Sequence, residues 1–351
     1  MSQKRPNVLR QALLAFLLLS LACQRPEAGA GKFRAEAPLT TVAFGSCNRQ
    51  NLPQPLWPEV QKQRPQVWVW LGDNIYGDSE DMAVLAEKYA VQQQQPDYAQ
   101  LASSTRVIGV WDDHDYGVND GGKEYPQREE SQQLFWDFVG EPADSPRRRQ
   151  RGVYSAHTFG PPGKQVKILL LDSRYHRDTL HQAVQQGVKV NLPNETGDVL
   201  GEEQWAWLEQ ELRNSSAQVH LIGNGIQVLP EDHRFEKWAN FPRSRQRLLN
   251  LIASTKAPGV ILLSGDRHHA EISRIERAGI PYPLYEITSS GLTHVTKEPT
   301  APEVNRHRVG EVVNRLHFGL LTLDWSQKRP LAEVKIKGEN DATYLTQTIR
   351  F

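Results

Sequence analysis

A carboxylate and a phenol lie close together after one apolar run of the sequence. The run from Val67 to Leu71 stops at a Gly-Asp pair, and Tyr76 follows three residues after Asp73. In open α/β sheets, ligand sites lie beyond the carboxyl ends of the strands. A phenol, whose usual pKa is about 10, gives up its proton only to a strongly polarising ion. The pair therefore points to a metal site, and the phenol favours a trivalent, iron-like ion.

A simpler interpretation of the same pair is also open. Asp is a favoured N-cap residue, so Asp73 would cap a following helix while the Tyr76 ring packs in a loop. The choice depends on whether residues of similar chemistry follow other strands.

Polar residues do follow several other short apolar runs, which we interpret as buried strands. They are Cys47 after residues 41–44, Asp112, Asp113, His114 and Asp115 after residues 107–111, Asp172 and Arg174 after residues 168–171, Asn224 after residues 219–222, and Asp266, Arg267 and His268 after residues 260–263. Charged groups that converge on one rim repel one another and are costly to desolvate unless cations neutralise them. A metal site explains such a cluster, whereas a role in stability does not.

The chemistry of each candidate ligand suggests a role. Asp73 has two carboxylate oxygens and would bridge two cations. Asp266 and His268 are two residues apart, so on an extended segment they would share a face and reach one centre. Cys47 as a thiolate would suit the metal that takes the phenol, although a free cysteine is often buried only for packing. At least one acid among residues 112–115 would bind a second, hard ion such as calcium or magnesium.

Other residues at the same rim are candidates for binding and proton transfer. His114 is the candidate general acid for a leaving group, with orientation of Asp113 as the alternative. Arg174 has a planar fork that suits phosphate oxygens, but an ion pair with Asp172 that closes a loop is equally ordinary. Asn74 and Arg267 each adjoin a ligand candidate, and we assign them to substrate binding.

Helical segments separate the apolar runs. They are expected at residues 82–94, 131–139, 201–213 and 243–254, and this alternation predicts a layered α/β fold. After Tyr282 the stretches are strand-like, at residues 284–287, 318–325, 332–336 and 344–349. We expect this half to supply a second sheet that packs on the first.

The composition suits a large globular protein without a nucleic-acid surface. The chain has 351 residues, of which 38% are hydrophobic, so it can bury a sizeable core. Its 41 basic and 41 acidic residues balance. This neutrality argues against a nucleic-acid-binding module.

The N-terminus has the layout of an export signal. Basic residues precede an apolar run from Ala12 to Ala22, and Cys23 follows. The run is shorter than the roughly 20 residues of a membrane span, which makes a permanent transmembrane helix the weaker alternative. Because the ending resembles a bacterial lipoprotein cleavage site, we predict a signal at residues 1–22, lipidation of Cys23 and a tether at residues 23–39. The protein would be exported, as a periplasmic or cell-envelope lipoprotein, and only an acylated Cys23 would attach it to a membrane.

Together the motifs resemble those of the PhoD-like alkaline phosphatase and phosphodiesterase family. This family belongs to the metallophosphoesterases and is a cousin of the purple acid phosphatases. The resemblance covers roughly residues 40 to 330 and is carried by Gly45–Cys47, Gly72–Tyr76, Trp111–Gly117, Leu171–Arg174 and Ser264–His268.

The resemblance implies a fold and a set of metal ligands. The fold would be a four-layer α/β/β/α metallophosphoesterase sandwich of two packed mixed sheets flanked by helices, formed by residues 40–351. The metals would be Fe3+ beside Ca2+, with Cys47, Asp73 and Tyr76 at the iron and Asp113, Asp266 and His268 at further metal positions. The chain departs from the family in having Asn74 where other members carry an aromatic residue, and we expect no separate N-terminal β-domain.

The resemblance also implies exported enzymes that hydrolyse phosphate monoesters and diesters with a metal-activated oxygen as the nucleophile. We therefore expect a phosphodiesterase or alkaline phosphomonoesterase, acting on a small phosphoester or a phospholipid-like substrate. Two alternatives stay open. One is a hydrolase with Cys47 as its nucleophile, and the other is a surface lipoprotein that binds metal or phosphate without turnover.

Overall fold

The computed structural model describes residues 1, 37–296, 303–327 and 329–351. The predicted export signal, the predicted lipidation site Cys23 and most of the predicted tether lie outside the described residues. Among the residues that are described, no helix has both the length and the apolar character needed to cross a membrane.

Six strands form the first sheet, in the order β15-β14-β13-β1-β2-β3. Their bounds are Thr41–Gly45 for β1, Val67–Leu71 for β2, Arg106–Val110 for β3, Phe318–Asp324 for β13, Leu331–Lys337 for β14 and Thr343–Arg350 for β15. β1, β2 and β3 are parallel, whereas β13 pairs antiparallel with β1. The pairing places Gly319 opposite Phe44. A Cβ atom at position 319 would lie 2.2 Å from the Phe44 ring, so this position needs a glycine.

Seven strands form the second sheet, in the order β12-β10-β11-β9-β8-β5-β4. Their bounds are Ser155–Phe159 for β4, Val166–Leu170 for β5, Val219–Gly223 for β8, Val260–Ser264 for β9, Ala270–Ile275 for β10, Leu284–Ser289 for β11 and Arg308–Val313 for β12. The central strands β5, β8, β9 and β11 are parallel, and antiparallel strands flank them. A separate hairpin consists of β6 (His181–Gln185) and β7 (Val188–Leu192).

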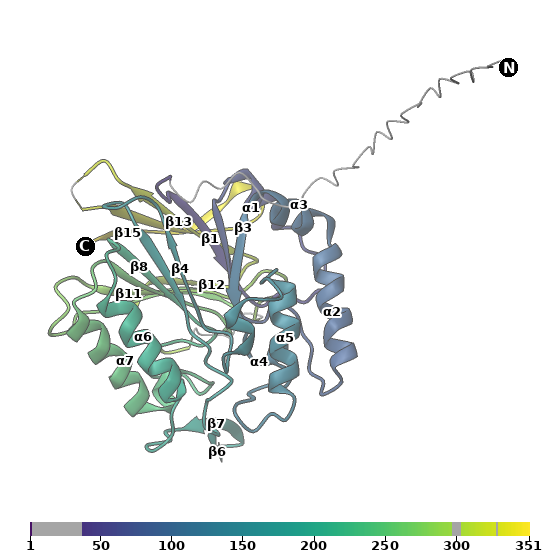
Figure 1. The fold of residues 1–351 in the computed structure, drawn as a ribbon. Helices are drawn as coiled ribbons and strands as arrows, with labels where there is room; N and C mark the ends of the chain where they lie inside the picture. Colours follow the sequence, from purple (N-terminus) through teal and green to yellow (C-terminus); the bar gives the residue numbers. More distant parts are fainter. Residues whose placement is uncertain (2–36, 297–302, 328) are drawn as a thin grey trace.

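Helices cover the outer faces of the two sheets (Figure 1). The helices are α1 (Trp57–Lys62), α2 (Met82–Gln94), α3 (Pro96–Ser104), α4 (Asp113–Tyr116), α5 (Arg128–Phe138), α6 (Gly201–Arg213) and α7 (Pro242–Thr255), with three short 3₁₀ turns at Pro146–Arg149, Trp238–Asn240 and Glu339–Asp341. α1, α2, α3 and α5 lie beside the first sheet, and α6 and α7 lie on the second. The predicted four-layer α/β class is thus confirmed.

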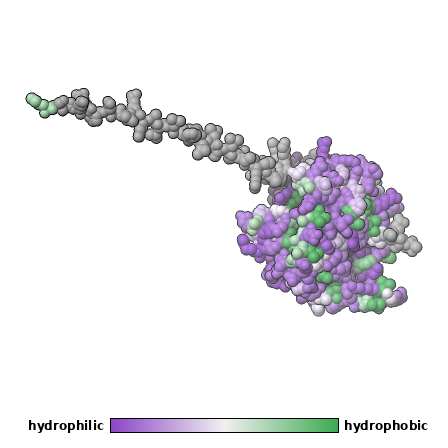
Figure 2. Space-filling view, turned by 90° about the vertical axis from the view of Figure 1, so that its right-hand side faces the viewer, coloured by the Kyte–Doolittle hydropathy of each residue, from purple (hydrophilic) through white to green (hydrophobic). Residues whose placement is uncertain are grey.

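Strand β5 shows how the second sheet is buried on both faces. Its alternate side chains point to opposite sides, as the pleat of a strand requires. Ile168 and Leu170 belong to the large core that also contains residues of the first sheet. Leu169 and the next residue, Leu171, belong to a separate core with α6 and α7. On the face shown in Figure 2 the surface is mostly hydrophilic, with apolar residues in small separate patches.

The prediction that the second half of the chain forms its own sheet is wrong. β13, β14 and β15 join the N-terminal strands in the first sheet, while β9 to β12 share the second sheet with β4, β5 and β8. Local hydrophobic patterns identify strands but do not specify their partners, because the partner is chosen by packing on both faces.

Candidate metal centre

The predicted ligands lie at neighbouring strand ends from both sheets. Among the described residues, three groups could each hold a metal ion, because the ligand atoms within each group lie within 4.8 Å of one another. The first group is Cys47, Asp73 and His268, the second is Asp73, Asp113 and His114, and the third is Asp112, Asp113 and Asp266. Asp73 belongs to the first and second groups, and Asp113 belongs to the second and third. The three groups therefore form one continuous cluster.

Four of these candidate ligands have a left-handed backbone. The φ angles are 59° at Cys47, 50° at Asp73, 66° at Asp266 and 54° at His268. Such conformations are uncommon outside glycine and cost of order 1–3 kcal/mol each, so they persist only where the surroundings impose them. Their concentration on one cluster indicates that the fold is shaped to aim these side chains.

The local geometry corrects the prediction for the pair two residues apart. Asp266 and His268 do not lie on an extended segment, because both residues have positive φ. They point into different groups, with His268 beside Cys47 and Asp73 and with Asp266 beside Asp112 and Asp113. Each would serve a different end of the cluster instead of one shared centre.

Tyr76 lies inside the cluster, as its position after Asp73 predicted. Its hydroxyl oxygen is 3.2 Å from Asp73 Oδ2, 3.1 Å from His268 Nε2 and 3.0 Å from His294 Nε2. Asp73 does not cap the next helix, because Asp81 is the N-cap of α2 and accepts a hydrogen bond from Ala83 N. The capping interpretation of Asp73 is therefore wrong.

His294 is a neighbour of the cluster that the sequence analysis did not select. Its Nε2 lies 3.3 Å from His268 Nε2 as well as 3.0 Å from the Tyr76 hydroxyl. Ser290 was also missed, and its Oγ lies 3.0 Å from Cys47 Sγ. Both residues follow β11, whose apolar run was recognised, so applying the strand-end rule to that run would have found them.

Buried acids crowd the centre, and their pKa values reflect it. Burial and the charge of Asp113 raise the pKa of Asp73 well above its usual range. Burial also raises the pKa of Asp112, against the opposing charge of Arg174. For Asp266, burial raises the pKa to about 7 despite the adjacent Arg267. Carboxyls that resist ionisation in this way would be stabilised as carboxylates by bound cations.

The donor set fits metal ions on two further observations. Asp112 Oδ2 is buried and has no hydrogen-bond partner in the part of the chain that the structure describes. Cys47 is a free thiol, fully buried, and its pKa is raised well above the usual value by burial and by Asp73. At one end of the cluster lie the thiol of Cys47, the phenol of Tyr76, the imidazole of His268 and the carboxylate of Asp73. The group of Asp112, Asp113 and Asp266 contains only carboxylates.

His114 lies at the edge of the cluster. Its Nδ1 is 2.6 Å from Asp78 Oδ1, and its ring centre is 4.1 Å from that of Tyr76. Burial lowers the pKa of His114, but Asp73, Asp113 and Asp78 outweigh burial and raise that pKa to about 10. The imidazole of the metal-free protein therefore holds its proton.

The structure places Arg174 beneath the centre and not at an open phosphate site. Its guanidinium is fully buried and pairs with Asp112 Oδ1 and Glu236 Oε2, each at 2.6 Å. The predicted partner Asp172 accepts a hydrogen bond from the backbone N–H of Arg174 and not from its guanidinium. Both the predicted contact with substrate and the predicted side-chain pair with Asp172 are therefore unsupported, since two other carboxylates already hold the fork.

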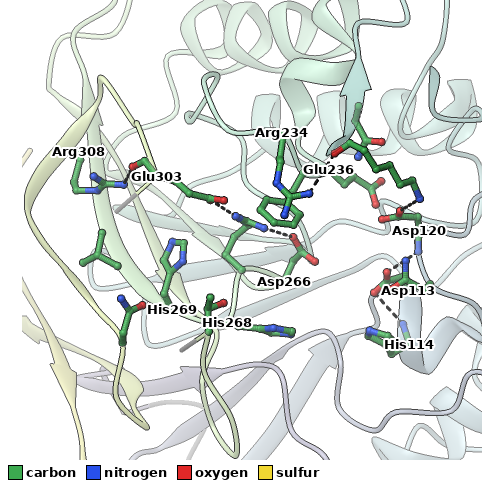
Figure 3. Close-up of a pocket in the computed structure, with 18 residues that line it drawn as sticks. Asp113, His114, Asp120, Arg234, Glu236, Asp266, His268, His269, Glu303 and Arg308 are labelled. Carbon is green, nitrogen blue, oxygen red and sulfur yellow. Dashed lines mark hydrogen bonds and ion pairs between the residues drawn. The ribbon is translucent and has the colours of Figure 1, made fainter. Parts of the chain in front are cut away.

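The two predicted substrate-binding residues occupy different surroundings. Asn74 is fully buried, and its amide donates to Val110 O at 3.1 Å and to Asp115 Oδ2 at 2.5 Å. It therefore holds the end of β3 in place, and it is not among the residues that line the cavity described next. Arg267, by contrast, lines a cavity of about 480 Å³ together with Asp113, His114, Asp266 and His268. Figure 3 shows Asp113 and His114 at one side of this cavity and Glu303, His269 and Arg308 at the other.

The PhoD-like phosphatase family model matches residues 42–329. The chain belongs to the PhoD-like phosphatase family. Alkaline phosphatase D of Bacillus subtilis (strain 168) is 25% identical to this PhoD-like chain in an alignment of 287 positions that covers 69% of this chain and 48% of that protein. The chain therefore spans about half the length of this curated relative.

Solved structures show the same fold. A structure of PhoD matches with a TM-score of 0.69 at 16% identity, over 88% of this PhoD-like chain and 69% of the other. Purple acid phosphatase PPD1 from yellow lupin (Lupinus luteus) seeds matches with a TM-score of 0.58 at 12% identity, over 90% of this chain and 54% of the other. These structures support the fold, and the match to the family model confirms the family resemblance seen in the sequence.

Proposed function

We propose that this PhoD-like chain is an exported, metal-dependent hydrolase of phosphate monoesters and diesters. The observation that carries the proposal is the continuous cluster of three ligand groups, joined by Asp73 and Asp113, beside a cavity of about 480 Å³. The likeness to alkaline phosphatase D supports the same chemistry.

The two ends of the cluster suit different ions. The thiol of Cys47 and the phenol of Tyr76, with Asp73 and His268, would hold Fe3+, because both anionic donors need a strongly polarising cation. Asp112, Asp113 and Asp266 offer only oxygens, which suits Ca2+. When bound, such a pair would lower the pKa of a water molecule and polarise the phosphoryl oxygens.

The protein residues around the cavity would divide the remaining tasks. Asp78 accepts the hydrogen bond from Nδ1 of His114, which leaves Nε2 as the nitrogen that would give a proton to the leaving oxygen. Arg267 lines the cavity and would contact phosphoryl oxygens. Arg174 would act as a positioning residue that holds Asp112 and lies 4.0 Å from Asp113.

Asp73→Asn tests the proposal directly. Metal content of the purified protein would be measured, with hydrolysis of p-nitrophenyl phosphate and bis(p-nitrophenyl) phosphate. The variant should keep its fold by circular dichroism and lose turnover, because Asp73 is the shared ligand of two groups. Asp144→Asn, at an exposed position, is the matched control and should keep parental turnover. Full activity in Asp73→Asn would refute the proposal.

The Cys47 nucleophile is the weaker alternative. The thiol is fully buried, and its close partners are Asp73 at 3.2 Å and Ser290 at 3.0 Å. Thiol alkylation separates the two mechanisms, since a ligated Cys47 should be protected by metal. The non-catalytic alternative, a surface protein that binds metal or phosphate, predicts metal or phosphate uptake with no turnover of either nitrophenyl ester.

Export and lipidation complete the proposal. The predicted signal at residues 1–22 would direct secretion, and an acylated Cys23 would attach the protein to a membrane. Labelling cells with a fatty-acid analogue should mark the parent and not Cys23→Ser, and unlabelled parent would exclude the anchor.

A further inference from the structure

The cavity extends beyond the ligand cluster to a wall that carries cationic side chains. Lys189, Arg234, Arg267 and Arg308 all line it, and Lys189 comes from the hairpin strand β7. At about 480 Å³ the cavity is in the size range that holds a whole small molecule, which is more than one phosphoryl group needs. Arg267 lies 3.8 Å from the proposed ligand Asp266 and would contact the phosphoryl group, so the other cationic side chains would face the rest of the substrate.

The charges of this wall differ in how they are paired. Lys189 lies 3.3 Å from Asp120, Arg267 pairs with Glu303, and Arg308 lies 2.7 Å from Glu271. Arg234 is the exception.

Within the described part of the chain, Arg234 forms no ion pair with a carboxylate, and its guanidinium donates to the backbone oxygen of Lys189 at 3.2 Å. Among the described residues, the positive charge of Arg234 is therefore not paired with a carboxylate.

The guanidinium of Arg234, an exposed residue, packs on an aromatic ring. The guanidinium carbon of Arg234 lies 4.0 Å from the centre of the Phe235 ring, and that of Arg267 lies 4.1 Å from the same centre. Cation–π contacts of this kind restrict the arginine rotamers. Less conformational entropy is then lost when an anion binds.

A second unsatisfied donor lies on the same ring. Arg267 is 6% exposed, and its Nε has no hydrogen-bond partner among the described residues. Two guanidinium groups with spare donor capacity thus face one cavity, and guanidinium forks bind carboxylate and phosphate oxygens well.

We propose that Arg234, held on Phe235, forms a subsite for a second anionic group of the substrate. This inference rests on the proposed hydrolase function and names its substrate class, namely phosphodiesters in which one alcohol carries a carboxylate or a further phosphate. The metal cluster would take the reacting phosphoryl group, and Arg234 would select for the second charge. Arg234 is thus a specificity-determining residue.

Three p-nitrophenyl diesters test the proposal because they share one leaving group. Their second alcohol is 3-hydroxypropionate, propanol or choline, so the charge at the far end is negative, absent or positive. The parent should prefer the anionic diester over the neutral one by about tenfold in kcat/KM, which is the factor expected for one charge-assisted contact at a partly exposed site. The choline diester should be the poorest substrate.

Variants of Arg234 assign that preference to the residue. Arg234→Gln should bring the anionic-to-neutral ratio of kcat/KM close to one, and Arg234→Lys should restore part of it, because charge is kept and the planar fork is lost. The control is Arg213→Gln, which removes an exposed arginine on α6 far from the cavity lining and should keep the parental ratio. An unchanged ratio in Arg234→Gln would overturn the proposal, as would an equal loss for all three diesters in both Arg234 variants.

A binding measurement separates failure of the subsite from failure of the hydrolase function. Calorimetry on the metal-loaded protein would compare 3-phosphonopropionate with propylphosphonate, neither of which contains a phosphoester bond. The parent should bind the carboxylated phosphonate about tenfold more tightly, and Arg234→Gln should lose this advantage. If that preference is found without turnover of any diester, the hydrolase proposal fails and the anion subsite stands. If both phosphonates bind equally to the parent, the subsite proposal fails.

Discussion

Replacing Arg174 should test whether this residue supports the site or binds substrate. The guanidinium is fully buried between Asp112 and Glu236, with both contacts at 2.6 Å. Arg174→Gln would leave the buried carboxylate of Asp112 without its cation, whereas Glu236 would keep Arg177 at 2.8 Å. Breaking a buried ion pair on one side costs about 3–5 kcal/mol. Since 1 kcal/mol shifts the melting temperature of a large domain by roughly 2 °C, we expect a loss of about 6–10 °C.

The assay is thermal unfolding of the metal-stripped protein at pH 7, read by circular dichroism. Arg213→Gln is the matched control, because its partner Glu209 lies 2.7 Å away but both side chains are about half exposed. An exposed pair of this kind contributes about 0–1 kcal/mol, so that variant should melt within about 2 °C of the parent. Kinetics complete the test. A melting temperature unchanged in Arg174→Gln, together with a raised KM, would refute the buried positioning role and return Arg174 to substrate binding.

Three further predictions concern other buried groups. Tyr76→Phe should erase the visible phenolate-to-iron band of iron-loaded protein while Tyr344→Phe keeps it, and a band that persists in Tyr76→Phe would contradict the iron assignment. Burial, with a further contribution from Lys167, holds the pKa of His220 at about 4. Because the unfolded histidine titrates near 6.5, stability conferred by neutral His220 is lost as pH falls from about 6.5 to 4, by about 2 kcal/mol between pH 7.5 and pH 5. The urea midpoint of unfolding should therefore fall less for His220→Gln than for the parent between these two pH values. Equal falls in the two proteins would contradict this reasoning. Gly225→Ala would place a Cβ 2.1 Å from Asp112 Oδ1, so calorimetry should show a melting temperature lower by roughly 2–6 °C, and a change within about 1 °C would contradict the close approach.

Much of the fold was predictable because its elements have strong local patterns. The helices expected at residues 82–94 and 201–213 agree with α2 and α6 at both ends. The hairpin of β6 and β7 was missed. β7 alternates apolar and polar residues from Val188 to Leu192, but β6 has no such alternation and neither strand contains a buried side chain. Strand partners were also missed, because the antiparallel pairing of β13 with β1 joins segments from opposite ends of the chain.

The candidate site was predictable at the level of residue identity more than geometry. The proximity of Asp73 and Tyr76 was predictable, because the strand-end rule depends only on chain direction and spacing. The divergence of Asp266 and His268 depends on left-handed backbone angles that no local pattern of these residue types indicates. The buried position of Arg174 was not predicted, because its carboxylate partners, Asp112 and Glu236, are distant in sequence.

The position of β13 sets the order in which the chain can fold during its synthesis. β1 lies between β13 and β2, so the N-terminal strand has an unpaired edge until residues 318–324 have left the ribosome. Such late, long-range pairing slows folding and leaves an exposed edge open to wrong partners in the meantime. A nascent chain that stops after β12 would carry all the predicted metal ligands and still lack half of the sheet that holds Cys47 and Asp73 in place. Completion of the last three strands is therefore the step at which the ligand cluster becomes a defined site.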